Sequence, residues 1–257
     1  MTTTRLIALA LALTMVALGE ARAETLRILT AGAFKQVLLA LIPQFQESGH
    51  EVKWETGTVG NIVSRIEAGE SFDVVIASPA ALATLAKSGK LEAGVDLAKV
   101  GVGVAVREGA ARPDIGSVDA FKRTLLAAKS VAYVDPAAGG SSGIYVSSLI
   151  DRLGIGAEVR QKAVLVRGGA AADRVVSGEA EIALQQISEL LPVKGVVLVG
   201  PLPSEIQNNT VYSAAIAAGA KDKPLPQALI DLVRSKAGAA AIANAGMEPV
   251  DPGSLAK

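Results

Sequence analysis

The sequence predicts an α/β protein of two lobes, each with a mostly parallel sheet flanked by helices. Short apolar runs alternate along the chain with stretches of helical spacing. This alternation occurs twice, over residues 25–78 and 131–199. Hydrophobic residues make up 50% of the chain, which is enough to bury a core in each lobe. We expect lobe 1 to span 24–103 and 207–257, and lobe 2 to span 104–206.

In the first block, strand and helix signals follow one another. The helical pattern after the first strand contains Pro43, which should kink or divide that helix. Gly69 is expected to end the second helix. Ser78 is an N-cap followed by Pro79 at the first helical position, which is a strong start signal for a third helix. The expected strands cover 25–31, 51–56 and 72–77, and the expected helices cover 34–47, 62–68 and 79–87.

The second block repeats this pattern and adds further pieces. A strand over 100–106 enters it and a strand over 210–217 leads back to lobe 1, so two crossing strands would form a hinge. The C-terminal helix over 226–245 should be interrupted by Gly238, and the tail from Pro249 should be loose. Between the hinge strands we expect strands over 131–134, 162–166, 181–185 and 195–199, and helices over 117–128 and 170–177 with another that ends at 153.

A glycine- and serine-rich turn, residues 135–143, lies between the strand 131–134 and the helix that follows. Backbone N–H groups collect at a helix N-terminus, and Ser141 and Ser142 add hydroxyls, so the turn suits a small anion. The turn also matches the G-x-S-x-G pattern of hydrolases, but the sole histidine, His50, lies upstream of the serine. It lacks the lysine of a phosphate-binding P-loop. Simple helix capping is the other explanation for these residues.

Three further strand-to-helix turns should face this one across a cleft. In open α/β sheets, ligands bind outside the carboxyl ends of the strands. The other turns cover 30–34, 56–61 and 167–172. Thr58 could donate a hydroxyl and Arg167 a bidentate guanidinium to a carboxylate or oxyanion. The alternatives are that Thr58 only caps a helix and that Arg167 is only a surface charge.

Composition narrows the class of protein. Residues 1–23 have a charged start, an apolar run and an A-x-A site, which predicts a cleaved secretory signal and a periplasmic protein. The chain has 25 basic and 25 acidic residues, which argues against nucleic acid as a partner. With no cysteine and one histidine, we expect no disulfide, metal site or cofactor. No coiled-coil pattern is present, so a monomer is expected.

Four segments together resemble the type II periplasmic solute-binding proteins of ABC importers, and most of all their molybdate-binding branch. The likeness extends over nearly all of the chain after the signal. No single segment is decisive. The order and spacing of the four segments together support the resemblance. The segments are Ile28–Gly32, Arg65–Ala77, Asp135–Tyr145 and Val176–Ala180.

The resemblance implies where a ligand would bind. The family binds its oxyanion through a serine in the first turn, and here Ala33 follows Gly32 at that place. A second serine of the family falls near Thr58, and a tyrosine falls near Gln185 or Gln186. Backbone N–H groups are implied at Ser142 and Ala170. Because hydroxyls are fewer here, we expect another small anion, such as an organic di- or tricarboxylate.

Three functions follow from this reading. The first is capture of a small anion, a molybdate-like oxyanion or a carboxylate, for delivery to an ABC permease in the inner membrane. The second is an enzyme on the same scaffold, since a periplasmic aconitate isomerase resembles this family. Its base would be a lysine, a glutamate or a neighbour of Tyr145. The third is an extracytoplasmic sensor, in which the ligand-bound protein docks on a receptor. The sequence does not distinguish this function from transport.

Overall fold

A computed structural model describes residues 25–250. The strands are β1 (Thr25–Ala31), β2 (Glu51–Gly57), β3 (Val74–Ala77), β4 (Val95–Arg107), β5 (Val131–Val134), β6 (Ala163–Val166), β7 (Ile182–Gln186), β8 (Val196–Pro201), β9 (Asn209–Ile216) and β10 (Glu248–Pro249). The α-helices are α1 (Lys35–Gln46), α2 (Val59–Glu67), α3 (Pro79–Lys87), α4 (Val118–Ala127), α5 (Ser141–Arg152), α6 (Gly156–Gln161), α7 (Ala172–Ser177), α8 (Ile187–Leu190), α9 (Pro224–Arg234) and α10 (Lys236–Asn244). Three short 3-10 helices are η1 (Gly32–Phe34), η2 (Pro136–Ala138) and η3 (Ser204–Ile206).

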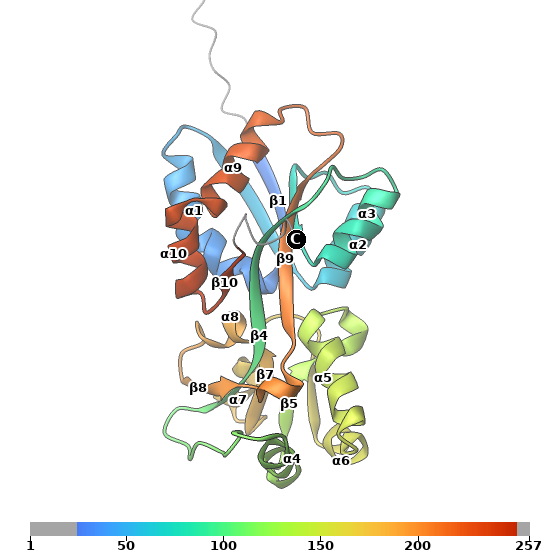
Figure 1. Ribbon diagram of the computed structural model, residues 1–257, viewed down its shortest axis with the longest axis vertical. Helices are drawn as coiled ribbons and strands as arrows, with labels where there is room; N and C mark the ends of the chain where they lie inside the picture. Colours follow the sequence, from blue (N-terminus) through green and yellow to red (C-terminus); the bar gives the residue numbers. More distant parts are fainter. Residues whose placement is uncertain (1–24, 251–257) are drawn as a thin grey trace, which may run out of the picture.

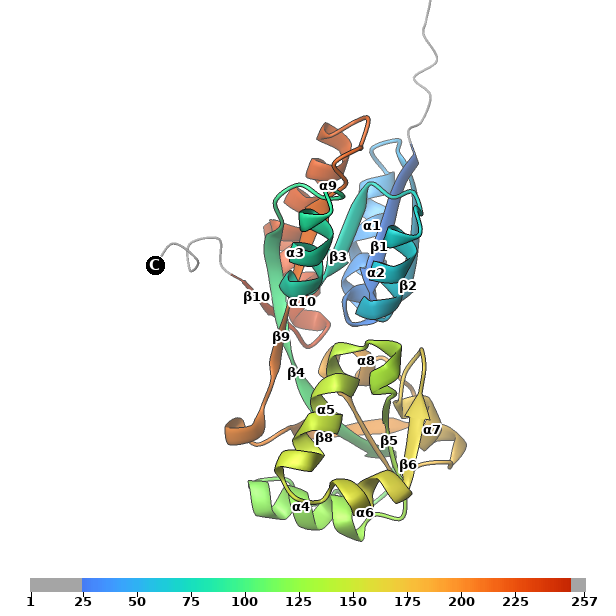
Figure 2. The ribbon, with the colours of Figure 1, turned by 90° about the vertical axis from the view of Figure 1, so that its right-hand side faces the viewer.

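The elements form two lobes joined by long strands, as Figures 1 and 2 show. The strand order is β2-β1-β3-β9-β4-β7-β5-β6, and β8 and β10 also pair with β4. In each lobe three strands are parallel: β1 with β2 and β3, and β5 with β6 and β7. The strands nearest the junction, β4, β8 and β9, pair antiparallel with their neighbours. The predicted α/β class with two lobes is confirmed.

Strand β4 passes from one lobe to the other within a single residue step. Gly101 is its last residue paired with β9, and Val102 is its first residue paired with β7. At this point the side chain of Gln207 pairs with the backbone of Val102, accepting from its N–H at 2.9 Å and donating to its carbonyl at 3.0 Å. This junction supports our division of the chain near 103 and 207, which stays an assignment of our own.

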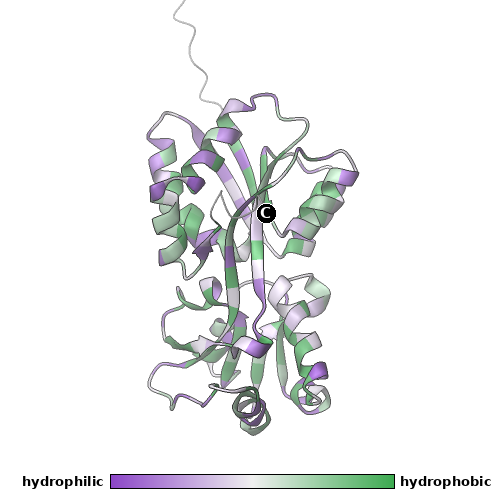
Figure 3. Cartoon of the chain, viewed as in Figure 1, coloured by the Kyte–Doolittle hydropathy of each residue, from purple (hydrophilic) through white to green (hydrophobic). Residues whose placement is uncertain are grey.

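Each lobe buries two apolar clusters, one on either side of its sheet. In lobe 1 the larger cluster includes Phe34 and Leu38, and the smaller includes Ile62 and Leu85. In lobe 2 the larger cluster includes Phe121. Strands and helices both carry hydrophobic and polar residues, as the mixed colours of Figure 3 show. Two covered faces explain why β3 and β5 are continuous apolar runs, whereas the edge strand β2 carries charged residues.

Most predicted elements appear within a residue or two of the expected bounds, and 25–31 and 131–134 match in full. Pro43 was expected to kink or divide its helix; α1 continues through it undivided, and the kink stays a prediction. The predicted interruption of the C-terminal helical stretch at Gly238 was wrong. The stretch breaks at Ser235 instead. Ser235 caps α10 by accepting from the N–H of Gly238 at 3.2 Å. Gly238 is instead a close-contact position, because a Cβ there would overlap the Val233 carbonyl.

Two more expectations need comment. The tail was expected to be loose from Pro249, yet Glu248 and Pro249 pair with β4. The predicted secretory signal at 1–23 lies outside the described residues. None of the helices within residues 25–250 has the length and apolar character needed to cross a membrane.

Candidate ligand-binding cleft

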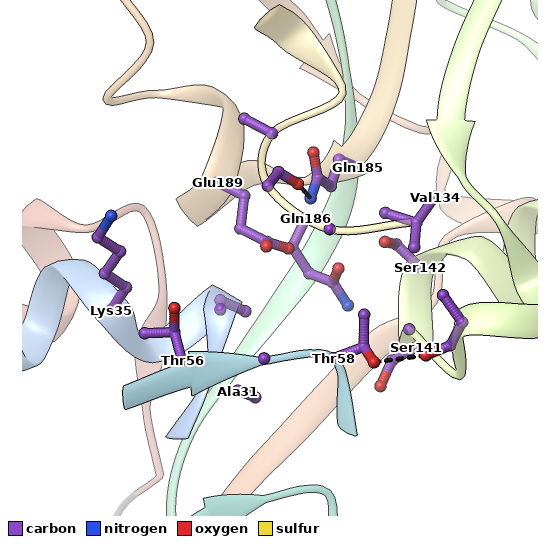
Figure 4. A pocket seen from close by; sticks show the side chains of 18 of the residues that line it. Ala31, Lys35, Thr56, Thr58, Val134, Ser141, Ser142, Gln185, Gln186 and Glu189 are labelled. Carbon is purple, nitrogen blue, oxygen red and sulfur yellow. Dashed lines mark hydrogen bonds between the residues drawn. The ribbon is translucent and has the colours of Figure 1, made fainter. Parts of the chain in front are cut away.

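A cavity of about 1010 Å³ lies between the two lobes. Its walls come from the carboxyl ends of parallel strands in both lobes, as expected for an open α/β sheet. Five turns contribute to it, one more than the sequence predicted. They follow β1, β2, β5, β6 and β7, and Figure 4 shows the side chains that they bring together.

Lobe 1 supplies the turns after β1 and β2. Gly32 and Ala33 begin η1 and line the cavity, and Ala33 offers no hydroxyl there. Thr58 is the N-cap of α2, and its Oγ1 accepts a hydrogen bond from the N–H of Asn61 at 3.1 Å. The capping role that we weighed for Thr58 is therefore real, and it comes in addition to its place in the cavity wall.

Lobe 2 supplies the glycine-rich turn after β5. Asp135 caps η2 by accepting from the N–H of Ala137 at 2.9 Å, and Gly139 follows in the left-handed region with φ of 71°. Ser141 and Ser142 then begin α5 and line the cavity. Ser142 is almost fully buried, so its hydroxyl is held in a desolvated environment. The turn thus has the helix-start geometry that the sequence predicted.

The two lobes are in direct contact along one edge of the cavity. Thr58 donates its hydroxyl to the Ala138 carbonyl, and the Gly60 N–H donates to the Gly139 carbonyl at 3.1 Å. The approach is very close, because a Cβ built on Gly60 would lie 2.9 Å from Cα of Gly139. We call this pair of contacts the latch. It joins the lobes at one edge of the cleft through the Thr58 hydroxyl, the Gly60 N–H and two backbone carbonyls of lobe 2.

The turn after β6 is fixed by Gln185, which is buried. Its Oε1 accepts from the Ala171 N–H at 2.6 Å and its Nε2 donates to the Gly169 carbonyl at 3.2 Å. Gln185 therefore positions this turn as well as lining the cavity. Arg167 lies at the entrance, where its side chain is 88% exposed and its Nε is 3.4 Å from Oδ2 of Asp135. Its charge is screened by solvent more than the buried groups are.

The fifth turn, after β7, was missed by the sequence reasoning. It places Gln186, Ser188 and Glu189 on the cavity wall. Figure 4 shows Gln186 and Glu189 there. A Cβ built on Gly32 would lie 2.7 Å from Oε1 of Glu189, so this carboxylate reaches lobe 1. Among the described residues, the buried hydroxyl of Ser188 has no hydrogen-bond partner. The strand 181–185 was predicted, and the rule that ligands meet carboxyl ends could have pointed to the residues after it.

Glu189 is the perturbed acid of the cavity. Burial raises its pKa to about 7, and a hydrogen bond with Gln185 opposes that shift. Tyr212 on β9 also lines the cavity, and burial together with the charge of Glu189 raises the pKa of its phenol. A carboxyl group with a pKa near neutrality can both accept and release a proton at working pH.

The structure brings every predicted site residue to this one cavity. All eight line it: Gly32, Ala33, Thr58, Ser141, Ser142, Arg167, Ala170 and Gln185. Their contacts with a ligand stay predictions. Gln186, Ser188, Glu189 and Tyr212 join them, although only Gln186 was considered from sequence, as a counterpart of a family tyrosine.

Comparison with known proteins agrees with this architecture. A family model described as bacterial extracellular solute-binding protein matches residues 26–248. A curated relative, the aconitate isomerase of a Pseudomonas species, is 34% identical over 236 residues, which is 88% of each chain.

Solved structures of anion-binding proteins share the fold. The periplasmic molybdate-binding protein of Azotobacter vinelandii superposes with a TM-score of 0.71 at 19% identity, covering 88% of this chain and 99% of that one. The sulfate-binding protein of Mycobacterium tuberculosis superposes with a TM-score of 0.70 at 19% identity, covering 89% and 88%. At this level of identity the likeness concerns the fold.

Proposed function

The chain belongs to the bacterial extracellular solute-binding proteins, and from this premise we propose that it captures a small organic anion, a di- or tricarboxylate, between its two lobes. Donors for the carboxylates come from the turns on both sides: Ser141 and Ser142 in lobe 2 and the backbone of η1 in lobe 1. Arg167 would attract the anion at the entrance.

One observation carries the choice of a carboxylate over a tetrahedral oxyanion. The lobes already touch through the latch, yet the cavity behind it still measures about 1010 Å³. Cavities of about 300–1,000 Å³ hold organic molecules of some size. A four-oxygen anion is too small for all of its oxygens to reach donors on both walls of this cavity. Ala33 has no hydroxyl that could extend from the lobe 1 wall toward such an anion.

The partner and location follow from the family. We propose that the protein acts in the periplasm and delivers its ligand to an ABC permease, with the closed lobes forming the docking surface. Cells that lack the protein should then take up the bound carboxylate more slowly than wild-type cells. Normal uptake in such cells would contradict the transport role and favour a sensor.

The binding proposal is tested by calorimetry and thermal shift with a panel of anions. We expect succinate, citrate and tricarballylate to raise the melting temperature, since a ligand at a hundred times its Kd stabilises the folded state by about 2.7 kcal/mol. Molybdate, tungstate, sulfate and phosphate should give smaller shifts at equal concentration. Stronger binding of molybdate or tungstate would show that Thr58, Ser142 and backbone amides suffice for an oxyanion.

A second candidate, an isomerase of an unsaturated tricarboxylate, is favoured by Glu189 and by the 34% identical aconitate isomerase. In such a reaction the Glu189 carboxylate would take a proton from a carbon next to the double bond. The electron pair of the broken C–H bond would shift the double bond, and the same proton would return two carbons away. No external oxidant or reductant is needed, and the enzyme ends in its starting protonation state.

Incubation with cis-aconitate separates the two candidates. An isomerase would form the trans isomer, visible by proton NMR, and the Glu189→Gln variant would lose this activity while still binding tricarboxylates. Absence of any trans isomer with wild-type protein that binds cis-aconitate would exclude the isomerase.

A further inference from the structure

Glu189 puts a negative charge inside a cavity that is otherwise built for an anion. The carboxylate comes from α8 of lobe 2 and lies against Gly32 of lobe 1, so it is partly buried between the lobes. The neighbouring buried Ser188 hydroxyl has no partner among the described residues and lines the same cavity. An ionised carboxylate is an acceptor only, and it cannot donate to an anionic ligand.

The charged groups around Glu189 do not cancel its charge. Tyr212, from β9, interacts with it electrostatically, and an ionised phenol there would add negative charge. The elements packed on α8 include β4, β7, β8 and η1. Of these only β4 contains titratable residues, Asp96, Lys99 and Arg107, and none of the three lines the cavity. The other charged side chains of the cavity wall are Lys35 on α1, Arg167, Asp173 on α7 and Lys194 after α8.

Two carboxylates that share one desolvated site do not both stay ionised, because like charges disfavour the charged form of each. One proton placed between them turns the repulsion into a short, charge-assisted O–H···O⁻ hydrogen bond. For capture of an anion without catalysis, a carboxylate at Glu189 has no other evident role. Glutamine would fill the same space and would donate to an anion directly.

We infer that the cleft binds its carboxylate ligand together with one proton, which is held between the ligand and Glu189. The inference rests on the proposed function, capture of a small carboxylate in this cavity. The proton comes from solvent when both groups are ionised beforehand. Because burial already raises the pKa of Glu189 to about 7, uptake is required above that pH and is largely complete before binding at pH 5.5.

Proton uptake is measured by titration calorimetry with tricarballylate, a saturated tricarboxylate that has no double bond to isomerise. The titration is run at pH 8.5 in two buffers with different ionisation enthalpies, and the difference in observed heat gives the protons taken up. We expect about one proton per ligand with wild-type protein. Above pH 7 the affinity should fall about tenfold for each pH unit.

The matched variants are Glu189→Gln and Glu158→Gln, the latter on the exposed surface of α6. E189Q should take up no proton, and its affinity should change less than about twofold between pH 7 and 8.5. E158Q should behave as wild type. Circular dichroism and melting curves establish that both variants fold, and the pH profile of the wild-type protein stands as a test without any variant.

Each remaining outcome counts against one statement. Tight binding by wild-type protein without proton uptake at pH 8.5 overturns the inference and leaves carboxylate capture intact. Uptake that persists in E189Q overturns it too, because another group then holds the proton. If no carboxylate of the panel binds at any pH, the proposed function is wrong and the inference falls with it.

Discussion

The cleft is closed at two places in different ways. At the latch, Thr58 and Gly60 of lobe 1 meet Ala138 and Gly139 of lobe 2 through hydrogen bonds, with no charged group involved. At the other place, Glu189 of lobe 2 approaches Gly32 of lobe 1 with a partly buried carboxyl group. The latch should therefore act the same at any pH. The Glu189 contact should depend on pH, so we expect it to determine how ligand affinity varies with the protonation state of the site.

The largest expected effect concerns the pH dependence of stability without ligand. The pKa of Glu189 is raised from 4.5 to about 7 in the folded protein. The stability of the folded state that depends on a protonated Glu189 is therefore fully present below pH 4.5 and is lost as the pH rises to about 7. The full change is roughly 3 kcal/mol in the free energy of unfolding. Denaturant titrations of wild type and E189Q at pH 4.5 and 7.5 measure it.

The Gln variant should show a smaller loss of stability over this window, by that same amount. Equal losses in the two proteins would mean that Glu189 is not desolvated in the closed form, and the contrast between the two contacts would disappear.

The next effect breaks the latch by adding one methyl group. In the Gly60→Ala variant the new Cβ would meet the backbone of Gly139 at 2.9 Å, where a backbone atom has little freedom to move. We expect ligand affinity to fall about a hundredfold, or about 2.8 kcal/mol. The melting temperature should hold or rise, because alanine is the better helix former.

Gly219→Ala is the matched control, since no atom lies within 4 Å of a Cβ at that position. Calorimetry at pH 6 and pH 8 measures both variants. A loss of affinity in G60A that changes with pH would contradict the assignment of a pH-independent latch.

The smallest effect removes a single hydroxyl from the latch. Thr58→Val keeps the shape but loses both the bond to the Ala138 carbonyl and the cap on α2. We expect about tenfold weaker binding and about 1 kcal/mol lower stability. Thr58→Ser retains the hydroxyl and should stay within about threefold of wild type. If valine and serine behave alike, the hydroxyl contributes nothing to closure.

Much of the architecture could be predicted because it depends on local patterns. The apolar runs over 25–31 and 131–134 define strands that are buried on both faces. The glycine- and serine-rich turn after Val134 predicts the start of a helix. Helix capping by Thr58 was considered from its position in the sequence alone. These features follow from side-chain periodicity and turn chemistry, which act over a few residues.

Other features were missed because distant residues decide them. Helix α8 has only four residues, too few for a periodic signal, and its buried position comes from packing on β4. The break between α9 and α10 lies at Ser235 because a hydroxyl cap outweighs the glycine three residues later. The paired tail at Glu248 depends on the exposed edge of β4.

The sequence by itself determined the class of fold, the order of its elements and eight of the residues that line the cleft. The fold and most of the site residues follow from periodicity, turn residues and the rule that ligands meet the carboxyl ends of parallel strands. The resemblance to a known family added Ala33, Ala170 and Gln185. Only the tertiary structure decided that Glu189 lies between the lobes and that Thr58 and Gly60 join them. Burial raises the pKa of a carboxyl group only when distant segments of the chain exclude water around it, and no local pattern encodes that exclusion.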